Sequence, residues 1–118
     1  MLFRSFDEME RISKGVGPEG VLSGFRDLDK LTNGFHPGNM VVIAARPAVG
    51  KSTFALDIVR NAAIHDKKTA VIFSLEMSRS EITMRMLSAE ARVALNSIRS
   101  GALTDDEWAR LEIGRAHV

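Results

Sequence analysis

Cysteine and tyrosine are absent from this 118-residue sequence, which also holds only three prolines. Without cysteine there is no disulfide framework, and the composition is typical of a reducing compartment. The longest apolar run, around residues 40–45, is too short to span a membrane, and the N-terminus lacks the apolar stretch of a signal peptide. A net charge of +1 excludes a basic footprint for nucleic acid in this segment. We therefore expect a soluble, cytoplasmic protein with no membrane partner.

What the sequence does contain is a short apolar segment, residues 40–44, followed by a loop that ends in Gly50-Lys51-Ser52 and by an amphipathic stretch over residues 54–65. A strand, a tight loop and a helix in this order predict a P-loop. Backbone N–H groups at a helix N-terminus are unpaired donors, and the helix macrodipole adds to their attraction for phosphate. We therefore predict that a nucleoside triphosphate is bound by the following loop residues: Arg46, Pro47, Ala48, Val49, Gly50, Lys51, Ser52 and Thr53.

Four of these residues have distinct predicted roles. Gly50 lets the backbone approach the phosphates, and Lys51 supplies a positive charge to the outer phosphates as a catalytic residue. Ser52 offers its hydroxyl to Mg²⁺, and Thr53 adds a donor to the inner phosphate. Ala45 stands where the usual pattern has glycine, which is acceptable if its φ angle is negative.

A second apolar run, residues 69–75, predicts a parallel strand buried on both faces, so that the unit is βαβ. Because ligands lie outside the carboxyl ends of such strands, Glu76 should emerge beside the phosphate loop. A carboxylate there can deprotonate the water that attacks the terminal phosphate, which makes Glu76 the candidate catalytic base. The alternative is a solvated acid at the end of a strand.

Helical patterns surround this unit. Residues 1–14 form a short amphipathic helix, whose apolar stripe packs either on its own domain or on a neighbouring subunit; residues 15–20 are a hinge. Ser78 with Glu81, and Thr104 with Glu107, are spaced as capping boxes that open further helices. Trp108 and Leu111 are spaced to face one core.

A family resemblance rests on three stretches: residues 24–38, the Ala-Arg-Pro and Gly-Lys-Ser motifs of residues 45–52, and Phe-Ser-Leu-Glu-Met at 73–77. Over residues 20–111 the chain resembles the RecA-like ATPase domain of DnaB-type replicative DNA helicases. The resemblance implies that Ala-Arg-Pro is the family's own variant of the loop and that Glu76 is its catalytic glutamate. Residues 1–14 are similar to the family's linker helix.

The resemblance further implies a homo-hexameric ring that unwinds duplex DNA from 5′ to 3′ by ATP hydrolysis, with single-stranded and forked DNA, primase and a helicase loader as partners. The family's amino-terminal domain, Mg²⁺-binding aspartate, DNA-contacting loops and arginine finger fall outside these residues. Because an arginine finger contributes about 10³–10⁵ in turnover, we expect negligible hydrolysis by this chain alone. Two alternatives stay open: another RecA-like ATPase of recombination or repair, and an inactive truncated product that binds nucleotide.

The predicted fold class is α/β: a RecA-like P-loop NTPase core with a partial parallel sheet and flanking helices, preceded by a linker helix. Its predicted parts are residues 1–20 (linker helix and hinge), 21–111 (the N-terminal part of the ATPase domain) and 112–118 (a non-native tail). The tail breaks the helical pattern, and the nucleotide string GAGATCGGAAGAGCACACGTC, which resembles a common sequencing adapter, encodes it. Two strands are too few for an independent sheet, which predicts a fragment of a larger protein.

Overall fold

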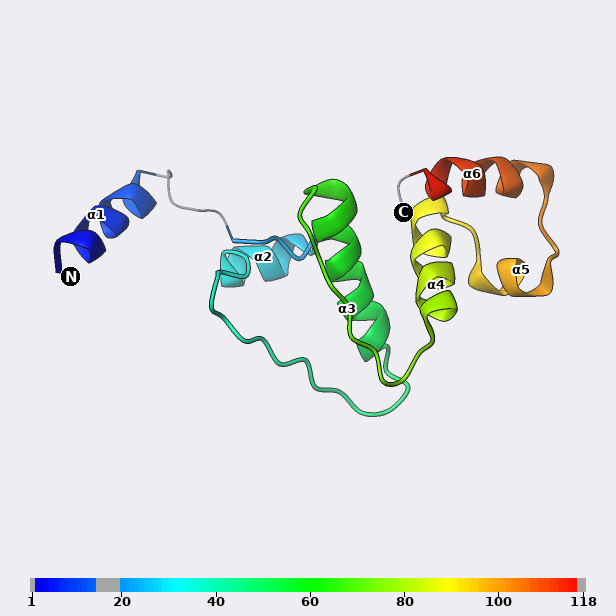
Figure 1. Cartoon of the computed structure of the whole chain (residues 1–118), viewed down its shortest axis with the longest axis horizontal. Coiled ribbons are helices and arrows are strands. Elements are labelled where there is room, and N and C mark those ends of the chain that lie inside the picture. The colour runs from blue at the N-terminus through cyan, green and yellow to red at the C-terminus, as the bar shows by residue number, and fades with distance from the viewer. Residues whose placement is uncertain (1, 15–19, 117–118) are drawn as a thin grey trace. The chain divides into compact units, whose positions relative to one another are not determined.

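The computed structural model describes residues 2–14 and 20–116 of the chain. Their helices are α1 (Leu2–Ser13), α2 (Arg26–Thr32), α3 (Lys51–Arg60), the π-helix η1 (Asn61–His65), α4 (Arg79–Ala91), α5 (Leu95–Ser100) and α6 (Asp105–Arg115) (Figure 1). The chain divides into two compact units, Met1–Val41 and Val42–Val118.

The predicted partial parallel sheet is wrong for the described residues, which are helical and contain no strand. Their only strand-like pairing is an antiparallel bridge in which Val21 and Phe35 exchange two hydrogen bonds of 2.8 Å. Both predicted strands run as irregular segments with exposed apolar side chains: Val42 is 74% exposed and Phe73 is 94% exposed. A parallel strand is stable when neighbouring strands and covering helices bury both its faces, and the described residues supply no neighbouring strand.

In the first unit, α1 confirms the predicted amphipathic helix. Its apolar side chains Phe6, Met9 and Ile12 are all exposed, and Lys14 pairs with Glu10 at 2.6 Å near the end of the helix. The two alternatives for this stripe, packing on its own domain or on a neighbouring subunit, both stay open. The predicted hinge falls, apart from Gly20, outside the described residues.

The same unit contains a small polar centre around Asp29 on α2. The buried Ser23 donates to Asp29 Oδ1 through its N–H at 2.8 Å and its Oγ at 2.6 Å. These bonds, the hydroxyl's above all, hold the pKa of Asp29 below its ordinary value, against the smaller opposing effect of burial. At the end of α2, Asn33 is the cap residue, in the left-handed conformation at φ 56°.

In the second unit, α4 packs against α3 on one side and against α5 and α6 on the other. One hydrophobic cluster of this unit consists of the buried Ala91, Val93 and Leu111. The prediction that Trp108 shares this core is wrong in part, since its side chain is 56% exposed. A salt bridge of 2.9 Å from Arg60 to Glu90 joins α3 to α4. Within residues 42–116 the helices thus form a packed group without a sheet.

The two predicted capping boxes differ in outcome. Thr104 and Glu107 form a complete box at the start of α6. At α4 only half of the box exists: Ser78 Oγ accepts from the N–H of Glu81 at 3.3 Å, while the Glu81 carboxylate binds two arginines instead.

The C-terminal helix is longer than the sequence suggested. The pattern was expected to break at residue 112, but α6 continues to Arg115 and buries Gly114 against α4, where an added Cβ would lie 3.3 Å from the Cβ of Ala91. The non-native origin of residues 112–118 stays a prediction.

Candidate nucleotide-binding site

The predicted phosphate loop leads directly into α3. Gly50 is the N-terminal cap residue with φ 99°, a conformation that glycine adopts without strain, and no side chain caps the helix. The first backbone bond of the helix runs from the N–H of Phe54 to the carbonyl of Gly50, at 2.9 Å. The N–H groups of residues 51–53 therefore lie at the open, positive end of α3.

Two further backbone angles bear on the loop. Ala45 is not among the described residues with positive φ, so its Cβ meets the condition set for replacing glycine there. Ala48 has φ 62°, which costs a residue with a Cβ about 1–2 kcal/mol. Such local strain is found where the surrounding structure fixes a functional backbone geometry.

A cavity of about 490 Å³ lies against this loop, and its size is within the usual range for small-molecule sites. Of the eight predicted loop residues only Val49 does not line it; its side chain is 69% exposed. The predicted catalytic residues Lys51 and Glu76 both line the cavity. The structure therefore brings together the two parts of the site that sequence reasoning had placed on separate segments.

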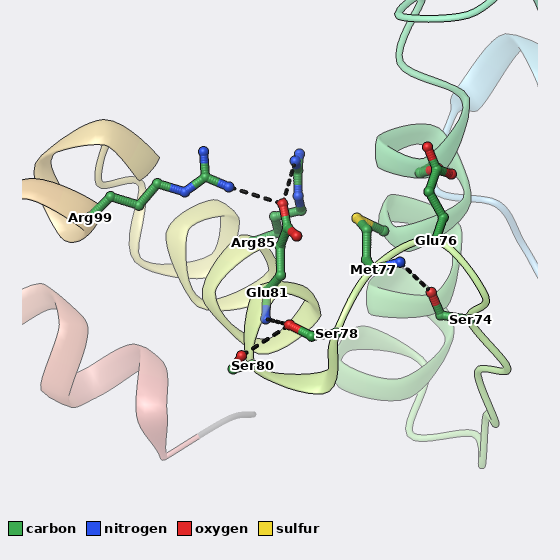
Figure 2. A network of polar contacts seen from close by, with 9 residues as sticks. Ser74, Glu76, Met77, Ser78, Ser80, Glu81, Arg85 and Arg99 are labelled. Atoms are coloured by element: carbon green, nitrogen blue, oxygen red, sulfur yellow. Dashed lines mark hydrogen bonds and ion pairs between the residues drawn. The ribbon is translucent and has the colours of Figure 1, made fainter.

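Glu76 reaches the loop although the described residues form no sheet that would carry it there. The segment after η1 runs back along α3 before it enters α4 (Figure 1), and residues 72–77 line a second hollow together with Ser52 and other residues of α3. Ser52 Oγ donates to Glu76 Oε2 at 3.1 Å. Ser74 Oγ accepts from the N–H of Met77 at 3.0 Å, which closes the turn that carries Glu76 (Figure 2).

Sequence reasoning missed three residues of this cavity: Met77, Glu81 and Arg85. Glu81 Oε1 accepts from Arg85 Nη2 at 3.0 Å and from Arg99 Nη2 at 2.9 Å, as Figure 2 shows. The spacing of Glu81 and Arg85, four residues apart on a helix, is a signal for their ion pair. The sequence holds no comparable signal that this pair faces the phosphate loop.

Comparison with known proteins connects this geometry to a family. The family model for the DnaB-like helicase C-terminal domain matches residues 20–117, which include the phosphate loop, Glu76 and Arg85. The chain belongs to this family. The resemblance to DnaB-type helicases is thereby confirmed, and the alternative of a recombination or repair ATPase loses its support.

Individual DnaB relatives agree with the family match. The chain is 49% identical over 115 residues to the replicative DNA helicase DnaB of Leifsonia xyli subsp. xyli, covering 97% of this chain and 25% of the relative. It is 39% identical over 112 residues to the enzyme of that name from Geobacillus stearothermophilus, covering 94% and 25%. The Buchnera aphidicola subsp. Baizongia pistaciae enzyme is 47% identical over 95 residues, covering 80% and 20%. The chain thus spans about a quarter of these relatives or less.

None of the described helices combines the length and apolar character that a membrane span requires.

Proposed function

We propose that this DnaB-family chain forms the nucleotide-binding part of a replicative DNA helicase, a hexameric ring in the cytoplasm that couples ATP hydrolysis to 5′-to-3′ unwinding of forked DNA. The observation that carries the proposal is the cavity in which the phosphate loop and Glu76 meet, within a segment that the helicase family model matches. We assign the contacts with DNA, and the binding of primase and of the helicase loader, to parts of a longer protein outside this chain.

The roles of the site residues follow from their positions. Lys51 and the open N–H groups of α3 bind the phosphates, because both present positive charge to the cavity. Mg²⁺ is commonly held by few protein groups together with substrate phosphates, and the hydroxyl of Ser52, which lies 3.1 Å from Glu76 Oε2, fits that arrangement. Bound Mg²⁺ would neutralise the charge that develops on the phosphates. Glu76 accepts the proton of the attacking water.

A binding experiment tests the first part of the proposal. The chain is titrated with a fluorescent ATP analogue and Mg²⁺, beside Lys51→Ala and the matched control Lys68→Ala, an exposed lysine away from the cavity. Binding by the chain and by the control, with loss of at least 10-fold in affinity for Lys51→Ala, is expected. Equal affinities for the two lysine variants, both folded by circular dichroism, would remove Lys51 from the site.

Hydrolysis requires the longer protein. In a chimaera that carries this chain in place of the matching quarter of the Geobacillus stearothermophilus helicase, Glu76→Gln is expected to keep ATP binding and to lower hydrolysis by about 10²–10⁴. An unchanged hydrolysis rate would reject Glu76 as the base and leave it as a solvated acid.

A further inference from the structure

Arg85, on the second turn of α4, is a cavity residue that the proposed function does not use. It lines the cavity together with Arg46, Lys51 and Glu76, and its side chain is only 32% exposed. In the described part of the chain its one hydrogen bond joins Nη2 to Glu81 Oε1, and its buried Nε has no partner. The Nη donors that do not bind Glu81 are thus available to another group.

The Glu81 carboxylate does not bind Arg85 exclusively. Its Oε1 also accepts from Arg99, which comes from α5 and is not among the cavity residues (Figure 2). Two guanidinium groups therefore share one carboxylate oxygen, which leaves one excess positive charge at the cavity wall. If Arg85 turns away, Glu81 keeps its ion pair with Arg99 and no buried charge is left without a partner.

From this arrangement we propose that Arg85 is a second phosphate-binding residue, which exchanges Glu81 for a phosphate group of the bound nucleoside triphosphate. A phosphate is a stronger partner than a shared carboxylate oxygen, because it offers several anionic oxygens to the planar guanidinium fork. The proposal rests on the nucleotide-binding function above and adds a residue of the same chain to it. Nucleotide binding then leaves Glu81 paired with Arg99 of α5 alone.

The test compares arginine variants of the full chain by titration with the fluorescent ATP analogue and Mg²⁺. Arg85→Gln is expected to weaken binding by about 10- to 100-fold, the range for losing a charge-assisted hydrogen bond. Arg79→Gln removes the same charge from an exposed position on the same helix, outside the cavity, and is expected to stay within about threefold of the unsubstituted chain. Competition by inorganic tripolyphosphate, which has no base or sugar, should fall in parallel for Arg85→Gln.

Each outcome decides a separate point. If Lys51→Ala loses binding while Arg85→Gln matches Arg79→Gln, Arg85 is only a structural partner of Glu81 and this proposal fails alone. If the unsubstituted chain does not bind, or Lys51→Ala binds normally, the nucleotide function itself fails. If Arg85→Gln weakens binding of the ATP analogue but not of tripolyphosphate, Arg85 does not contact the phosphates and the proposal fails.

Should Arg85→Gln unfold, Glu81→Gln supplies a second test. This change releases Arg85 and removes a negative charge from the cavity, so the ATP analogue is expected to bind at least threefold more tightly. Unchanged affinity in this variant would overturn the proposal.

Discussion

The packing of α6 on α4 depends on one buried leucine, Leu111. Leu111 of α6 is 6% exposed and packs in the core with Ala91, the last residue of α4, and with Val93, which follows that helix. Substitution by alanine removes about three methylene-sized groups, which at about 0.8 kcal/mol each gives about 2.4 kcal/mol before any cavity is counted. With the cavity term we expect Leu111→Ala to lower the free energy of unfolding by about 2–4 kcal/mol.

Urea unfolding measures this loss by two signals, the helical circular dichroism and the fluorescence of Trp108, the chain's one tryptophan, on the same helix. The matched control is Ile113→Ala, an aliphatic residue two positions away whose side chain is 65% exposed. It should cost less than about 1 kcal/mol, since it buries little area and alanine favours the helix. Equal unfolding midpoints for the two variants would refute the packing of α6 on α4.

Two further changes test local features. Arg92 caps α4 in the left-handed conformation at φ 53°. Arg92→Gly is therefore expected to raise the free energy of unfolding by about 0.5–1 kcal/mol, measured by urea titration. The control Arg115→Gly, at a helical position, should lower the free energy of unfolding. The lowered pKa of Asp29 stabilises the folded chain above the unfolded value near 3.8, and this contribution is lost as pH falls through the lower folded pKa. In Ser23→Ala the pKa of Asp29, followed by carboxyl NMR, should rise toward 3.8; an unchanged value would contradict the assigned cause.

Helices and their ends could be predicted because a few neighbouring residues decide them. The amphipathic helix α1 and the capping box at Thr104 each depend on residues within one or two turns. The strands could not be predicted in this way, because residues 40–44 and 69–75 need partners distant in sequence. Their apolar composition indicates that these side chains are stable when buried, and the described residues do not bury them.

The candidate site likewise has one part that neighbouring residues decide and one part that depends on contacts distant in sequence. Its phosphate loop is contiguous in sequence and was predicted as one motif, and Glu76 was assigned through a rule about strand ends. Glu81 and Arg85 were missed as cavity residues because their position depends on how α4 packs against α3. The residues that face a site from a second helix are set by tertiary packing, which no local spacing records.

The exposed apolar segments also bear on the behaviour of this chain in solution. Val42, Val71 and Phe73 lie in β-prone stretches whose backbone groups are free of any ladder within the described residues. Such stretches are templates for pairing between molecules, since a second copy supplies the same hydrogen bonds and apolar contacts that a larger sheet would. Association of copies through these segments, rather than unfolding of the helical core, then sets the concentration up to which the chain stays monomeric.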